Sequence, residues 1–220
     1  MKEFKYTEID QYYDKDYFDT PGKKSVYTDS STIVSSEWHR QACGWFNSVV
    51  PVKDKKLLDA GCGVGHFMQG FENLGADSYG CDVSNFCADI LIERNPNKFY
   101  HTCIEEMNMV PKSFFDIAYC GDVFEHIPAE FTERSLLNLI SVCKPGGILY
   151  IAIDTTSYNH EGFQDISHIN MQSWDEWLAE MDRPIYCWRH EFNLELKLRE
   201  EKGFPGFPYD YWRFAVMRKN

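Results

Sequence analysis

The fold is decided by one stretch of the chain, Leu57-Leu58-Asp59-Ala60-Gly61-Cys62-Gly63-Val64-Gly65-His66-Phe67. Its apolar start predicts a strand that ends at an acidic residue, and a helix is expected from about His66. Glycine stands at every second position between these two elements. Because glycine has no Cβ and tolerates positive φ, the backbone can approach a ligand closely here. The start of the helix adds free N–H groups and the positive end of its dipole.

The spacing of the glycines narrows the class of ligand. A dinucleotide-binding fingerprint requires a third glycine three residues after the second, and His66 stands at that position. A phosphate-binding Walker loop requires Gly-Lys-Ser/Thr, which does not follow. The pattern that remains is D-x-G-x-G-x-G over residues 59–65.

Composition and charge exclude several classes of protein. The formal net charge of -12 at pH 7 argues against a nucleic-acid-binding surface, which needs clustered lysine and arginine. No apolar run approaches the roughly 20 residues of a membrane span. The polar N-terminus is unlike a signal peptide, so we expect a cytoplasmic protein. The 8 cysteines form no C-x-x-C pair, which predicts free thiols and no structural zinc site.

We expect one main domain over residues 37–220, preceded by an arm over residues 1–36. The arm is rich in polar residues and carries a group of aromatic side chains, Tyr12, Tyr13, Tyr17 and Phe18. Two interpretations stay open: a poorly ordered extension, or a lid whose rings cover a ligand.

Strands and helices are predicted to alternate along the main domain. The expected strands cover residues 55–60, 78–81, 98–103, 114–120 and 148–153, and strand-like segments at 185–190 and 211–217 should pair antiparallel at one sheet edge. The expected helices cover residues 36–50, 66–74, 84–94, 129–143 and 172–181, with sharp turns at 144–147 and 205–208. This pattern predicts an α/β fold, a doubly wound and mostly parallel sheet with helices on both faces.

A doubly wound sheet binds ligands at the carboxyl ends of its strands. The first four strands therefore deliver Gly61, Asp82, Cys103 and Gly121 to one cleft. Asp82 follows the second strand, where a carboxylate can accept hydrogen bonds from both hydroxyls of a ribose.

Five segments together resemble successive motifs of the class I, Rossmann-like S-adenosylmethionine-dependent methyltransferases. They are residues 57–67, 79–84, 114–119, 124–127 and 139–150, in the order and spacing of that family. The resemblance is to the group that methylates ubiquinone precursors, sugars and glycans, and it covers about residues 55–155. It implies a seven-stranded sheet with one antiparallel strand, and S-adenosylmethionine as the methyl donor.

The resemblance also implies a set of cofactor-binding residues: Asp59, Gly61, Cys62, Gly63, Gly65, Asp82, Val83, Ile104, Glu105, Gly121 and Asp122. Asp59 would organise the glycine loop, Asp82 would hold the ribose, and Asp122 would lie near the methionine part. Ile104 and Glu105 would meet the edge of the adenine. Many relatives carry Asp directly after the third strand, where this chain has Cys103. Either Glu105 substitutes for that Asp as the residue that contacts the adenine amino group, or this contact with the adenine is absent.

Three residues are candidates for the chemistry on the acceptor: His168, His126 and Asp154. His168 lies between the fifth strand and the next helix, where acceptor sites of the family lie, and Asp165 is a candidate to fix its tautomer. His126 is an alternative base, or it supports the wall of the cleft. A divalent metal on Asp154, His160 and Asp165 is conceivable, but the spacing is not diagnostic and we expect no metal.

We therefore expect methyl transfer from S-adenosylmethionine to a small molecule or a glycan precursor, at oxygen by analogy with the family. Two alternatives stay open: a protein methyltransferase, and a non-catalytic module that binds the cofactor or a partner. Residues 188–207 would complete an acceptor pocket or form a partner surface. The oligomeric state is not predictable from these residues.

Overall fold

A computed structural model describes residues 6–19, 32–155, 165–201 and 212–220. Its centre is a seven-stranded sheet with the order β3-β2-β1-β4-β5-β7-β6. The strands are β1 (Lys56–Ala60), β2 (Asp77–Asp82), β3 (Phe99–His101), β4 (Phe115–Gly121), β5 (Cys143–Asp154), β6 (Trp188–His190) and β7 (Trp212–Lys219). β7 runs antiparallel to β5 and to β6, and the remaining pairs are parallel. The predicted doubly wound sheet with one antiparallel strand is confirmed.

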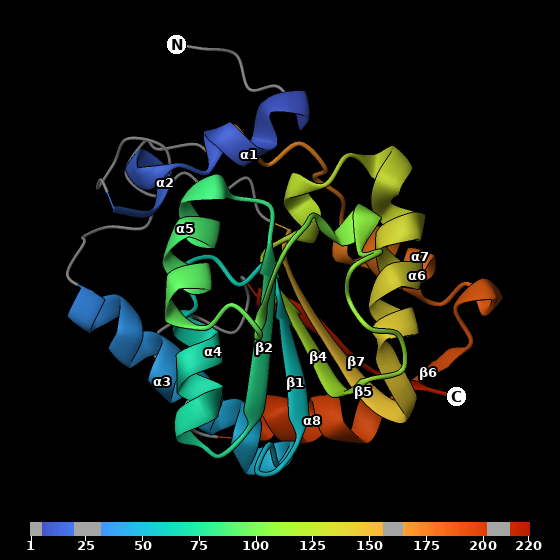
Figure 1. The fold of residues 1–220 in the computed structure, drawn as a ribbon. Helices are drawn as coiled ribbons and strands as arrows, with labels where there is room; N and C mark the ends of the chain where they lie inside the picture. Colours follow the sequence, from blue (N-terminus) through green and yellow to red (C-terminus); the bar gives the residue numbers. More distant parts are fainter. Residues whose placement is uncertain (1–5, 20–31, 156–164, 202–211) are drawn as a thin grey trace.

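Helices cover both faces of the sheet (Figure 1). One face packs against α3 (Thr32–Val49), α4 (His66–Asn73) and α8 (Phe192–Glu200), and the other against α6 (Thr132–Val142) and α7 (Trp174–Met181). α5 (Asn85–Arg94) packs beside α4, where Met68 and Leu91 share a small core. The alternation of side chains along each strand explains the two layers, since neighbouring residues point to opposite faces. Leu57 joins the core under α3, and Leu58 joins the core under α6.

The ends of the helices follow the signals in the sequence. The Ser84 side chain caps α5 by accepting from the Cys87 N–H at 3.1 Å. Gly75 follows α4 with φ of 89°, a conformation that favours glycine. Ser173 and Glu176 form a capping box at the start of α7.

Several elements differ from the sequence prediction. Residues 144–147 do not form a separate turn: they lie inside β5, as an irregularity at which the pairing shifts from Phe115–Cys143 to Ile117–Ile148. β3 is shorter than predicted because residues after His101 lead into the 3-10 turn η2 (Ile104–Glu106). Helix α8 was not predicted. The expected turn at 205–208 lies outside the described residues.

Residues 6–19, here called the N-terminal segment, lie across the carboxyl ends of the strands. They form η1 (Tyr6–Glu8), α1 (Ile9–Tyr12) and α2 (Lys15–Asp19), at the top of the molecule in Figure 1. Tyr13 and Tyr17 are buried. The division of the chain near residue 36 stays a prediction, and α3 begins at Thr32.

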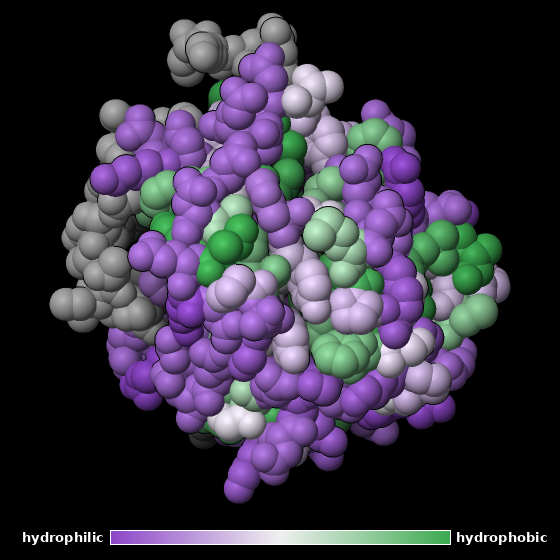
Figure 2. All heavy atoms as spheres, in the orientation of Figure 1, coloured by the Kyte–Doolittle hydropathy of each residue, from purple (hydrophilic) through white to green (hydrophobic). Residues whose placement is uncertain are grey.

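The surface is mostly hydrophilic on the face drawn in Figure 2, with hydrophobic side chains scattered among polar ones. None of the described helices is long and apolar enough to cross a membrane.

Candidate functional site

The glycine loop between β1 and α4 curls back over the end of β2. The N–H groups of Gly61 and Cys62 both donate to the carbonyl of Cys81, at 2.8 and 3.0 Å. Gly61 has φ of 79°, and a Cβ there would lie 2.3 Å from the Cγ2 atom of Val123. Position 61 therefore requires glycine for two reasons. Its backbone has a positive φ, and the loop that follows β4 approaches its Cα closely.

Asp82 joins the end of β2 to the glycine loop. Its carboxylate accepts from the Gly63 N–H at 2.8 Å and from the Ser84 N–H at 2.9 Å. Burial raises the pKa of Asp82, although both hydrogen bonds favour the ionised form. Each carboxylate oxygen has a further lone pair, so Asp82 can still accept from the two hydroxyls of a ribose.

Three more carboxylates are buried at the strand ends, each with one oxygen that has no partner among the described residues. They are Asp59 Oδ2, Asp122 Oδ1 and Glu125 Oε2. Burial, and secondly the charge of Asp82, raises the pKa of Asp59 to about 8. Burial and the charge of Asp154 raise the pKa of Asp122.

Such unpaired buried carboxyl groups are costly unless a ligand satisfies them. A cationic ligand with its own hydrogen-bond donors would do so. The sulfonium and ammonium groups of S-adenosylmethionine have this chemistry, so the residues present fit the expected cofactor.

The end of β3 carries the residues predicted for the adenine edge. Ile104 is buried, and its carbonyl accepts from the Asn138 side chain at 2.9 Å. Glu105 is also buried, and it accepts a hydrogen bond from the hydroxyl of Tyr6. The Val83 carbonyl oxygen lies within hydrogen-bond distance, 3.0 Å, of Nε2 of the His101 ring. Gly121 ends β4, directly before Asp122.

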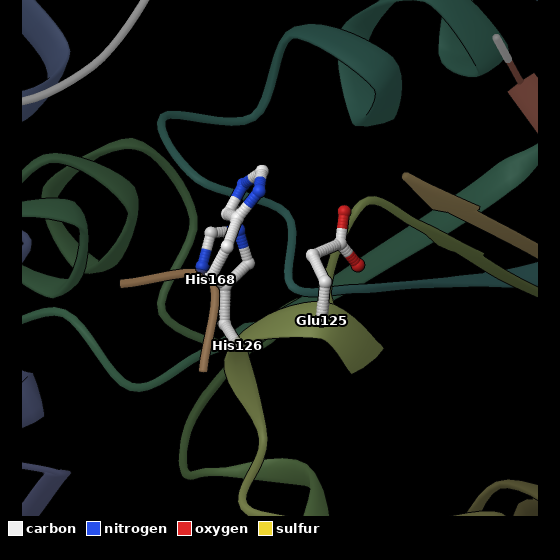
Figure 3. Close-up of side chains that lie close together, drawn as sticks. All are labelled: Glu125, His126 and His168. Carbon is white, nitrogen blue, oxygen red and sulfur yellow. The ribbon is translucent and has the colours of Figure 1, made fainter. Parts of the chain in front are cut away.

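The two candidate histidines lie next to each other in the fold. His126 contacts Ser167, which is 41 positions further along the chain and directly precedes His168. Their ring centroids are 4.6 Å apart in an edge-to-face arrangement. In Figure 3 the His126 and Glu125 side chains project to the same side of η3 (Phe124–His126), and the His168 imidazole lies against that of His126. Burial, and then the neighbouring His168, lowers the pKa of His126 to about 4.

The surroundings of His168 differ from the prediction in one respect. The Asp165 carboxylate accepts from the Ser167 N–H at 2.9 Å, from the Ser167 hydroxyl and from the Tyr17 hydroxyl at 3.2 Å. Asp165 thus orders the loop and the N-terminal segment, while Ser167 contacts Nδ1 of His126. The Asp154 N–H donates to Glu125 Oε1 at 3.2 Å, at the end of β5.

The structure also gathers a group of possible metal ligands. Glu125, His126 and His168 each offer one ligand atom, and these atoms all lie within 4.8 Å of one another. This group differs from the one weighed on the sequence, of which His160 lies outside the described residues. The expectation of no metal stays a prediction.

Sequence reasoning missed the contacts that the N-terminal segment makes with the cleft. The Tyr13 ring packs edge-on against His126 with centroids 5.8 Å apart, and the Tyr13 carbonyl accepts from the Ser84 hydroxyl. Phe18 lies over the glycine loop, 3.2 Å from where a Cβ of Gly63 would be. The group of aromatic residues at positions 12–18 was the available signal, which the sequence analysis interpreted as an arm or a lid.

Comparisons with known proteins agree with the family that the sequence motifs predict. A family model described as a methyltransferase domain matches residues 36–204. The chain is 25% identical over 182 residues to a ubiquinone biosynthesis O-methyltransferase of Albidiferax ferrireducens, covering 76% of this chain and 71% of that protein. The enzyme of the same name from Coxiella burnetii is 29% identical over 108 residues, covering 47% of this chain and 45% of that protein.

Solved structures agree at the level of the fold. Magnesium protoporphyrin IX methyltransferase from Synechocystis PCC 6803, with bound S-adenosylhomocysteine, superposes with a TM-score of 0.64 over 97% of this chain and 99% of that chain. The sequence identity is 13%. The 1,6-didemethyltoxoflavin-N1-methyltransferase from Burkholderia thailandensis gives a TM-score of 0.57 at 16% identity, over 86% of this chain and 81% of that chain.

Proposed function

Because the chain belongs to the S-adenosylmethionine-dependent methyltransferases, we propose that it methylates a hydroxyl group of a small molecule or a glycan precursor. The observation that carries this proposal is the histidine pair beside the unpaired carboxylates at the strand ends. It puts a possible base next to the groups that suit a cationic methyl donor.

The bound cofactor supplies a methyl group that its sulfonium already activates. What the protein must add is orientation of the acceptor, which can supply roughly 7–11 kcal/mol of the barrier, and removal of a proton. Asp82 binds the ribose in this proposal, while Asp59 and Asp122 face the positive charges of the methionine part. Asp154, whose charge acts on Asp122, orients the acceptor.

We assign proton removal to His168. The carbonyl oxygen of Ser167 can only accept, so His126 donates to it through Nδ1–H at 3.2 Å. The lowered pKa of His126 favours its neutral form, with the one ring proton on Nδ1. A neutral neighbour does not repel the charge that His168 acquires when it takes the proton from the acceptor hydroxyl. His168 is also only half-buried, which leaves its ring accessible to an acceptor.

A small acceptor is favoured over a protein acceptor by the N-terminal segment. Tyr13 and Tyr17 are buried over the strand ends, and a segment packed there suits a small acceptor better than a peptide. The distant curated relatives are named as O-methyltransferases of ubiquinone biosynthesis, which favours oxygen as the acceptor atom. A protein acceptor and a non-catalytic binding module remain the alternatives that the experiment must separate.

The test is transfer of labelled methyl from S-adenosylmethionine to the small-molecule fraction of a cell extract by wild type and by His168→Ala. We expect the variant to lose about 10²–10⁴-fold in rate, the usual contribution of a general base, with unchanged affinity for S-adenosylhomocysteine. His190→Ala is the matched control, since His190 lies on the edge strand β6 and contacts Asp182. Equal rates for His168→Ala and wild type would remove His168 as the base.

The same assay, repeated after dialysis against a chelator, tests whether the reaction needs a metal ion. We expect full activity after dialysis. A loss of activity that added metal restores would contradict the expected absence of a metal.

A further inference from the structure

The side chains of Glu125, His126 and His168 form a group that can bind a metal ion. Glu125 and His126 belong to η3, and His168 belongs to the segment between β5 and α7. Each offers one ligand atom, and the three atoms lie within 4.8 Å of one another. Figure 3 shows these three side chains. Their contacts decide whether the ligand atoms are available to an ion.

The Glu125 carboxylate has one oxygen available. The side chain is fully buried, and Oε1 accepts from the Asp154 N–H at 3.2 Å. Oε2 is buried and has no hydrogen-bond partner among the described residues. Burial, and after it the charges of Asp122 and Asp154, raise the pKa of Glu125, so further carboxyl groups lie close by. A bound cation would stabilise a buried carboxylate in such surroundings.

The ring of His126 is oriented as a metal ligand. Its Nδ1 atom lies 3.2 Å from the carbonyl oxygen of Ser167, which can only accept a hydrogen bond. The ring proton of the neutral imidazole is therefore on Nδ1, and Nε2 keeps its lone pair. Histidines that bind metal ions typically donate their other N–H to a backbone carbonyl or a carboxylate in this way.

The set of ligand atoms favours zinc among the divalent ions. Two imidazole nitrogens and one carboxylate oxygen form a three-residue zinc site that leaves the fourth position open, whereas magnesium and calcium prefer oxygen ligands. Zinc bonds of about 2.0–2.2 Å require ligand atoms within about 4 Å of one another. His168 is half-buried in a segment without regular secondary structure, so a small rotation of its side chain closes the remaining distance.

We propose that Glu125, His126 and His168 form a binding site for Zn²⁺, and that the bound ion inhibits methyl transfer because it takes the lone pair that His168 needs as a base. Binding of the ion is independent of the proposed function, and the inhibition rests on it. The ion is an inhibitor and not a cofactor, so the proposal agrees with a reaction that needs no metal.

The first experiment measures zinc affinity by calorimetry with zinc chloride. Wild type is compared with Glu125→Gln, His126→Gln and His168→Ala. His190→Ala is the matched control, because His190 also lies beside a carboxylate, that of Asp182, but on the edge strand β6. Thermal unfolding without metal establishes that each variant is folded.

We expect one tightly bound ion per chain in wild type and in the His190→Ala control. Each of the three ligand variants should bind zinc about 100-fold more weakly or worse, since loss of an outer-shell partner alone costs about 10–100-fold. Zinc affinity that is the same in all variants, or no binding by wild type at micromolar zinc, would overturn the proposal.

The second experiment separates this site from the native thiols, since the described cysteines are all free. Cobalt replaces zinc in such sites, and a cobalt–thiolate bond adds a strong absorption band in the near ultraviolet. His168→Cys puts a thiol at one ligand position, so it should gain this band when Co²⁺ is added. An equal band in wild type would place the ion on a native cysteine and overturn the proposal.

The third experiment adds zinc chloride to the labelled-methyl assay. Wild type and His190→Ala should lose activity at zinc concentrations that match the measured dissociation constant, and excess chelator should restore it. The residual activity of His126→Gln should be at least about 10-fold less sensitive to zinc, as its weaker binding requires.

The two parts of the proposal fail in different ways from the proposed function. Zinc held by these three residues with an unchanged rate of methyl transfer would overturn the inhibition. A protein that binds zinc through them but methylates no small molecule would contradict the proposed function and leave the metal site standing.

Discussion

We expect cofactor binding to depend most on Asp82, because this residue would serve two purposes at once. It accepts from Gly63 and Ser84 N–H groups, and it is the predicted partner of the ribose. We predict that Asp82→Ala weakens binding of S-adenosylhomocysteine by about 1–3 kcal/mol, measured by calorimetry. Asp77→Ala is the control at the opposite end of β2, where the carboxylate pairs with Lys56. Equal losses in the two variants would show that the site does not use Asp82.

The raised pKa values of the buried carboxyl groups predict how cofactor binding depends on pH. The pKa of Asp59 is about 8 and that of Asp122 is also raised, so both groups hold protons near neutral pH without ligand. A cationic ligand favours the ionised forms, so binding releases protons and affinity increases as the pH rises toward 8. The increase is at most about 10-fold per pH unit for each proton released.

Calorimetry between pH 6 and 9, in buffers of different ionisation enthalpy, measures this proton release. Asp122→Asn should flatten the dependence. An affinity that falls with rising pH would contradict the proposed contact between these carboxyl groups and the cofactor's positive charges.

At the scale of single elements, the glycine loop and helix α3 respond in opposite ways to an added methyl group. Gly61→Ala puts a Cβ into Val123 at positive φ, and should destabilise the fold by about 1–3 kcal/mol or more. Gly44 lies within α3 with nothing within 4 Å of an added Cβ, so Gly44→Ala should stabilise by up to about 1 kcal/mol. Urea unfolding measures both. A destabilised Gly44→Ala variant would contradict this account of α3.

The sequence predicts most elements because each has a local signal. Apolar runs mark β1, β4 and β5, and Ser84 marks the start of α5. Helix α8 lacks such a signal: among the described positions of its sequence FNLELKLRE only Leu198 is buried, and it is fixed by packing on α3, with the Trp45 indole donating to its carbonyl at 3.0 Å. The irregularity in β5 likewise depends on its pairing with β4, which no local pattern encodes.

The residues of the candidate site likewise divide into those with a local signal in the sequence and those without one. Glycines and strand-terminal acids are recognisable because backbone geometry demands them at fixed places. The contacts of Tyr6 with Glu105 and of Tyr17 with Asp165 join residues 99 and 148 positions apart. Only the assembled fold brings them together, so sequence reasoning left residues 1–36 as either an arm or a lid.

At the scale of the whole molecule, one end of the sheet gathers everything that the proposed reaction needs. The strand ends carry the proposed cofactor residues, the segment after β5 carries His168, and the N-terminal segment lies over both. In the proposed function this arrangement would cover the reacting groups with the buried tyrosines of the N-terminal segment.

The measurement that tests the central claim most directly is labelled-methyl transfer into a cell extract, followed by separation of small molecules from protein. With wild-type protein we predict label in the small-molecule fraction, attached through oxygen, and its loss with His168→Ala. Label confined to the protein fraction, or no transfer by a protein that binds S-adenosylhomocysteine, would contradict the claim.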